Sequence, residues 1–178
     1  KLFDLPIYFK TDNTFTNLNK KTSDNANDLS VTRFDMYNKL SAPLKLVNFL
    51  SVAPFVGARD TIYSRNLNDG EDEFRTAFYT GVDMSAKFSK TYEASGKFLG
   101  VDFNKLHHIV TPTIEYEYIH QPSIDPAKLE QLDDTDAVDL KDTFTLGLEN
   151  RIQTKRMIGE SLKTIGLGYL LITGDYLY

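Results

Sequence analysis

The 178-residue sequence has no cysteine, no tryptophan and no long run of apolar residues. The lack of cysteine excludes a disulfide framework and thiolate chemistry. A transmembrane helix needs about 20 consecutive and mostly apolar residues, so a helical membrane protein is excluded as well. A membrane β-barrel is still allowed, because its strands alternate apolar and polar residues and never form such a run.

Basic residues are outnumbered, with 20 Lys and Arg against 25 Asp and Glu and a formal net charge of -5. A nucleic-acid-binding surface is normally basic, so we expect no nucleic-acid partner. No signal peptide is visible, and the chain begins at Lys1 without Met. We therefore expect a processed N-terminus or a piece of a longer protein.

What the sequence does contain is the two-residue period of β-strands. In residues 105–120 the even positions include Leu106, Val110 and Ile114, whereas the odd positions are mostly polar. Residues 143–155 repeat the pattern. Because successive side chains of a strand point to opposite faces, this pattern predicts a sheet with one apolar face and one polar face.

Extended segments of this kind predict about seven antiparallel strands in up-and-down order, at 2–17, 31–40, 46–64, 74–92, 105–120, 143–155 and from 162 onward. Several exceed the 5–6 residues typical of soluble sheets and suit the roughly 9–11 residues of a tilted membrane-spanning strand. The expected connections are polar at 18–30, 65–73 and 121–142, short at 41–45 and 156–161, and glycine-containing at 94–104. Long loops at one end and short turns at the other are typical of an outer-membrane barrel. The predicted fold class is therefore all-β, an antiparallel transmembrane β-barrel.

Five stretches, in order, cover most of residues 31–157: 33–37 (RFDMY), 40–44 (LSAPL), 54–63 (PFVGARDTIY), 108–118 (HIVTPTIEYEY) and 146–155 (LGLENRIQTK). Together they resemble the LPS-assembly protein family, LptD, also called organic solvent tolerance protein. This family is the outer-membrane component of lipopolysaccharide transport in Gram-negative bacteria.

The resemblance implies that residues 1–178 form one partial barrel domain, with no second domain, from the middle of a barrel larger than seven strands. It implies a multi-pass location in the cell outer membrane, in contact with outer-membrane lipids. It further implies lipopolysaccharide as cargo, a plug lipoprotein inside the barrel, and periplasmic bridge proteins reached through an N-terminal domain absent here. Nothing in the sequence suggests an enzyme, and we expect no catalytic residues, cofactor or metal.

The polar face supplies candidates for the barrel lumen: Arg59, Arg75, Asp83, Lys87, Glu115, Glu117, Glu149, Arg151 and Lys155. As a surface they would tolerate a sugar-phosphate head group or contact the plug. Taken singly, we interpret each as a partner in cross-strand charge pairing, worth a few tenths to about 1 kcal/mol. The apolar face supplies candidates for lipid contact: Val52, Val56, Phe78, Val82, Phe88, Val110, Ile114, Tyr116, Leu146 and Leu148.

The connection at 121–142 is dense in aspartate, but 133–136 (DDTD) lacks the spacing and glycine of a calcium loop, so we interpret it as a solvated loop. Adjacent His107 and His108 should face opposite ways and cannot chelate one metal together. Pro54 and Pro112 fall within strands, where we expect bulges or a weakened ladder. Tyrosines near strand ends suggest an aromatic girdle, namely Tyr63, Tyr79, Tyr92, Tyr116 and Tyr118.

Two other classes fit parts of the pattern. One is a complete eight-stranded outer-membrane barrel acting as an adhesin or passive pore. The other is a soluble β-sandwich binding module, in which the apolar faces would pack on each other. Closure of the sheet on itself distinguishes a complete small barrel from a section of the wall of a larger barrel, because unpaired sheet edges are untenable in lipid.

Overall fold

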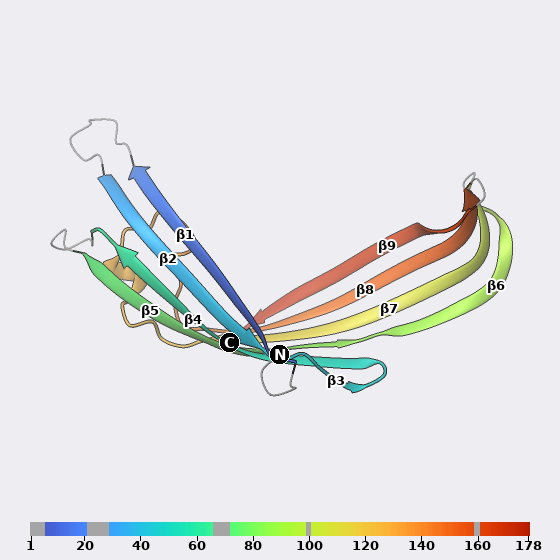
Figure 1. Cartoon of the computed structure of the whole chain (residues 1–178), viewed down its shortest axis with the longest axis horizontal. Coiled ribbons are helices and arrows are strands. Elements are labelled where there is room, and N and C mark those ends of the chain that lie inside the picture. Colours follow the sequence, from blue (N-terminus) through green and yellow to red (C-terminus); the bar gives the residue numbers. More distant parts are fainter. Residues whose placement is uncertain (1–5, 21–28, 66–71, 99–100, 159–160) are drawn as a thin grey trace.

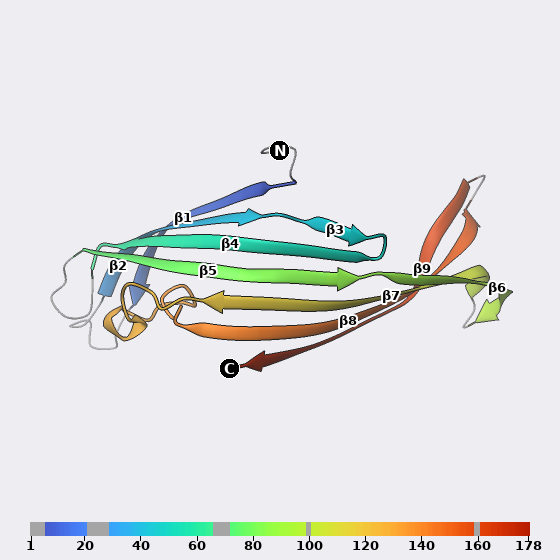
Figure 2. The ribbon, with the colours of Figure 1, turned by 90° about the horizontal axis from the view of Figure 1, so that it is seen from below.

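A computed structural model describes residues 6–20, 29–65, 72–98, 101–158 and 161–178. Within these ranges nine strands form one sheet: β1 (Tyr8–Lys20), β2 (Leu29–Ser41), β3 (Leu44–Val47), β4 (Leu50–Tyr63), β5 (Glu73–Ala86), β6 (Phe88–Phe98), β7 (Val101–Ile119), β8 (Lys141–Ile158) and β9 (Ser161–Leu177). The main order is β1-β2-β4-β5-β7-β8-β9, while β3 pairs only with β4 and β6 only with β7. Every pairing is antiparallel. The sheet curls into a half-barrel (Figures 1 and 2), which confirms the all-β antiparallel prediction.

Several expected boundaries were wrong. The segment 46–64 is two strands, β3 and β4, joined by a tight turn, and 74–92 divides at Lys87 into β5 and β6. The expected connection at 94–104 instead belongs mostly to the β6–β7 pair. The alternation of side chains continues through both points. β5 and β6 follow each other along the same neighbour, β7, while the β3–β4 turn reverses the chain and still joins even positions to even positions, as in Leu44 and Val52. Parts of the expected strand 2–17 and of the connections 18–30, 65–73 and 156–161 lie outside the described residues.

The two mid-strand prolines lie in regular register rather than at bulges. Pro54 faces Val82, and Pro112 faces Leu148. The register shifts occur elsewhere in the sheet, so of the two expected outcomes the bulges were wrong and the weakened ladder is confirmed. Each proline instead lies beside a break in a neighbouring strand, where a missing N–H costs little. Pro54 is beside the gap between β2 and β3, and Pro112 is beside the gap between β5 and β6.

The register separates the two faces of the sheet as the alternation predicted. The partners across β4, β5, β7 and β8 join even positions to even positions, as in the row Met84, Ile114, Leu146. This outer face keeps large apolar side chains exposed: Leu146 is 58% exposed and Phe78 57%. All ten lipid-contact candidates lie on this face by register.

The inner face contains the buried residues. Phe55, Ala77, Tyr79 and Ile119 form one buried cluster. It lies on β4, β5 and β7, where the phenyl ring of Phe55 occupies the space above Gly81, its register partner in β5. A side chain at that position would meet this ring and the carbonyl oxygen of Tyr116. Glycine at this position therefore allows an aromatic ring to cross the strand.

Candidate functional site

Three arginines project from neighbouring strands on the inner face. Arg33 lies on β2, Arg59 on β4 and Arg75 on β5, and Arg33 and Arg75 are only 4% and 1% exposed. Such burial is costly for a charged group unless its hydrogen-bond donors are satisfied. The partners come mainly from residues 120–140, which we call the inner loop.

The inner loop connects β7 to β8 along the chain and folds back against the inner face over β2, β4 and β5 (Figures 1 and 2). It contains one 3-10 turn, Pro126–Lys128, capped by the Asp125 carboxylate, which accepts from the Ala127 N–H at 2.8 Å. Leu129 follows the turn and is fully buried against Val31 and Tyr63. An apolar anchor and a capped turn therefore fix the loop on the sheet.

Asp136 joins the inner loop to Arg33. Its carboxylate is 0% exposed and accepts from Arg33 Nη1 at 2.6 Å. The other oxygen accepts from the backbone N–H groups of Leu132 and Asp133 at 3.0 and 3.2 Å. The expectation of a solvated loop was therefore wrong here, because paired charges from distant strands bury part of the aspartate cluster.

Asp133 holds the same guanidinium from a second side. Both of its oxygens accept from Arg33, at 2.7 and 2.5 Å, in a bidentate arrangement. Charge-assisted bonds of this kind favour the ionised carboxylate. The hydrogen bonds from Arg33 accordingly lower the pKa of Asp133 to about 2, although partial burial opposes the shift.

The other two arginines bind different partners. Arg59 forms a bidentate pair with Asp35 on β2, with distances of 2.9 and 3.0 Å, and Asp35 also accepts from Thr61. Arg75 donates to the backbone carbonyl oxygens of Thr135 and Asp136, each at 3.2 Å, and of Val138. Cross-strand charge pairing is therefore present at Arg59, whereas Arg75 binds the loop backbone.

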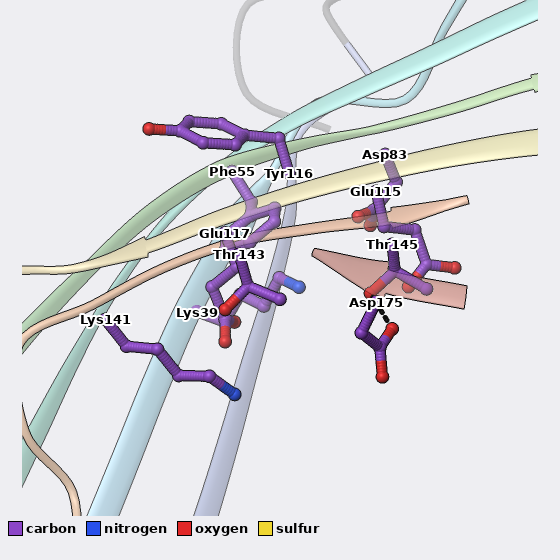
Figure 3. Close-up of a pocket in the computed structure, with 10 residues that line it drawn as sticks. All are labelled: Lys39, Phe55, Asp83, Glu115, Tyr116, Glu117, Lys141, Thr143, Thr145 and Asp175. Atoms are coloured by element: carbon purple, nitrogen blue, oxygen red, sulfur yellow. Dashed lines mark hydrogen bonds between the residues drawn. The ribbon is translucent and has the colours of Figure 1, made fainter. Parts of the chain in front are cut away.

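Beside the inner loop lies a hollow of about 350 Å³ lined by side chains from six strands (Figure 3). Four carboxylates line it against two ammonium groups: Asp83, Glu115, Glu117 and Asp175 against Lys39 and Lys141. We call it the acidic hollow. Three of the predicted lumen-facing residues meet here, and the Tyr116 ring points away from them to the outer face (Figure 3).

The remaining lumen candidates are more scattered. Glu149 and Arg151 pair with each other along β8 at 2.5 Å rather than across strands. Lys155 lines a second hollow near the β8–β9 turn. Lys87 is exposed in the gap between β5 and β6. The polar face is therefore one surface with separate groups of charges.

Arg33 and Asp35 occupy odd positions of the expected strand 31–40 but are not among the predicted lumen residues. Their partners are 24 to 103 residues away, so no local motif marks them. A usable signal was the recurrence of opposite charges at inner positions of adjacent strands, together with a long acidic connection that could cover them.

The histidines and tyrosines give mixed outcomes. His107 and His108 lie on opposite faces, as the strand period predicted, with partners Gln153 and Ile152. Among the described residues no group of three or more His, Asp or Glu side chains is placed to hold a metal ion. The girdle expectation was wrong for Tyr63 and Tyr79, because both are buried on the inner face, where the inner loop and Phe55 cover them.

Comparison of the chain with known protein families, with curated proteins and with solved structures finds no match. Within the described ranges, no helix has the length and apolar character needed to cross a membrane.

Proposed function

We propose that this chain is a wall section of the outer-membrane lipopolysaccharide translocon, which inserts lipopolysaccharide into the outer leaflet of the outer membrane. The observation that supports this most is the inverted distribution of polarity. Large apolar side chains are exposed across the outer face, while buried arginines and aspartates lie on the inner face. A contiguous exposed apolar face normally marks contact with lipid or protein.

The outer face suits lipid because its apolar character continues across strands. One row in register joins Phe9, Leu40 and Val56 across three strands, and another joins Pro54, Val82, Tyr116 and Phe144 across four. A soluble β-sandwich would cover this face with a second sheet, and all nine described strands belong to one sheet. The proposal therefore assigns the outer face to the hydrocarbon layer of the outer membrane.

The inner face suits a hydrated, charged cargo or a protein plug. It presents charged hollows and hydroxyl groups. Lipopolysaccharide has a phosphorylated sugar head group, which needs such a surface. The stretches in 31–157 that resemble the LPS-assembly family give the proposal its specific cargo and its partners, the plug lipoprotein and the periplasmic bridge proteins.

The sheet edges favour a wall section over a complete small barrel. In the described part of the chain β1 pairs only with β2, and β9 only with β8. In lipid an unpaired edge leaves backbone groups without partners. The proposal therefore pairs both edges with further strands of the same wall.

The test uses the host cell. Depletion of the protein should lower surface lipopolysaccharide while an unrelated outer-membrane protein stays at its normal level. A photo-crosslinking residue at Asp83 on the inner face should capture lipopolysaccharide or a protein plug, and one at Phe78 on the outer face should capture membrane lipid. Unchanged surface lipopolysaccharide after depletion would refute the proposal.

A further inference from the structure

The second hollow lies at the end of the half-barrel that has short turns. It has a volume of about 350 Å³ and is lined by Lys105, His107, Gln153, Lys155 and Thr164, among others. Its volume is within the range of roughly 300–1,000 Å³ of small-molecule sites. We call it the basic hollow, because two lysines and no carboxylate line it.

A β-bulge shapes the basic hollow. The β7–β8 register shifts between Asn104 and Leu106, and Lys105 has a φ of 58°, which is uncommon for a residue other than glycine. The Thr154 hydroxyl stabilises the bulge: it accepts from the Asn104 N–H at 3.0 Å and lies 3.1 Å from the Lys105 carbonyl oxygen. Thr154 is 1% exposed, so this support is built into the sheet. Bulges commonly redirect a side chain at functional positions.

The cationic groups of the basic hollow are accessible. Lys105 pairs with Glu93 at 2.9 Å, but both side chains are more than half exposed, so the pair is weak and can exchange for a stronger anion. Lys155 forms no ion pair within the described ranges. The His107 ring contacts Thr91 through Nδ1 at 2.9 Å, which directs its other nitrogen elsewhere.

We propose that the basic hollow binds a phosphorylated sugar. The phosphate lies between the Lys105 and Lys155 ammonium groups, and Gln153 and Thr164 hydrogen-bond to sugar hydroxyls. The acidic hollow and the basic hollow have opposite charge, so the inner face would bind the anion at the end with short turns. This inference rests on the proposed function for the choice of sugar phosphate, but the binding itself does not require transport.

The test is calorimetric titration of the complete barrel that contains this chain, in detergent micelles at low salt, with glucosamine 1-phosphate as the probe. We expect binding that weakens as salt rises, with a Kd at least tenfold lower than that for glucosamine. Inorganic phosphate should bind more weakly than the sugar phosphate. Equal affinity for glucosamine and its phosphate would overturn the proposal, and equal affinity for inorganic phosphate would overturn its sugar component.

Matched double variants locate the site. Lys105→Gln with Lys155→Gln should raise the Kd about tenfold, whereas Lys39→Gln with Lys141→Gln in the acidic hollow should leave it unchanged. Lys105→Arg with Lys155→Arg keeps both charges and should retain binding, which separates lost charge from lost folding. Equal effects of the two glutamine pairs would overturn the assignment. The titration and the depletion experiment fail separately. If the sugar phosphate binds but depletion leaves surface lipopolysaccharide unchanged, the site stands and the transport role is refuted. If depletion lowers surface lipopolysaccharide but the sugar phosphate does not bind, only the site is refuted.

Discussion

Replacing Asp136 by alanine should release the inner loop without unfolding the sheet. The carboxylate makes three hydrogen bonds, one to the buried Arg33 and two to backbone N–H groups of its own loop. Removing one member of a buried ion pair costs roughly 3–5 kcal/mol. Arg33 keeps its bidentate contact with Asp133, so we expect a cost near the lower limit, about 3 kcal/mol.

That cost should appear as local opening. A change of about 3 kcal/mol raises the population of the open loop about 100-fold. Hydrogen exchange resolves it: the N–H groups of Leu129 and Asp136, which donate within the loop, should lose protection by that factor. Amides of β4 and β5 should keep theirs. Trypsin should also cleave after Lys128 more quickly in the variant.

Asp134→Ala is the matched control. Asp134 is exposed, two residues from Asp136, and makes no hydrogen bond or ion pair within the described part of the chain. Its replacement should change exchange in the loop less than threefold, because surface substitutions usually cost under about 0.5 kcal/mol. Equal exchange in the two variants would refute the reasoning, as would a loss of protection spread evenly over the sheet.

Three further results follow from the same contacts. Hydrogen bonds from Arg33 lower the pKa of Asp133 from 3.8 to about 2, so the contribution of Asp133 to loop closure should be complete above pH 3.8 and be lost as the pH falls toward 2. The rate at which a protease cleaves the loop should therefore rise across that pH range. Asp133→Asn should abolish this pH dependence. Gly81→Val should destabilise the sheet by about 1–3 kcal/mol, because the new side chain meets the Phe55 ring, and denaturant titration that shows no change would contradict that packing. Cysteines at Lys10 and Tyr169 should not cross-link in the membrane, whereas facing positions on β5 and β7 should; an efficient bond between the first pair would favour a small closed barrel.

The strand period made the faces of this sheet predictable. Every lipid-contact candidate lies on the outer face, because the two-residue alternation is preserved along each strand and the register keeps like faces together. The strand breaks at Lys87 and Phe49 were not predictable in the same way. The alternation runs unchanged from β5 to β6 and through the β3–β4 turn, so the sequence pattern marks neither break.

The packing of the inner loop could not be predicted from the residue pattern of individual strands. Its aspartates are typical of a solvated connection, but Asp136 is buried against Arg33, and Arg75 binds the loop backbone beside it; the pairing of β2, β4 and β5 brings the two arginines together. The sequence distance between Arg33 and Asp136 is 103 residues. A contact of that kind is a property of the assembled sheet, and composition alone cannot distinguish it from an exposed acidic loop.

The two faces of the half-barrel are therefore under different constraints. Large apolar residues are exposed on the outer face in both halves of the sheet. Inner burial is concentrated on β2, β4 and β5, where the inner loop docks, whereas the described side chains of β9 are almost all exposed. Within the described ranges the inner loop covers only this half of the inner face. The uncovered half contains the basic hollow, so its two lysines lie on a part of the inner face that the loop leaves free to meet a ligand.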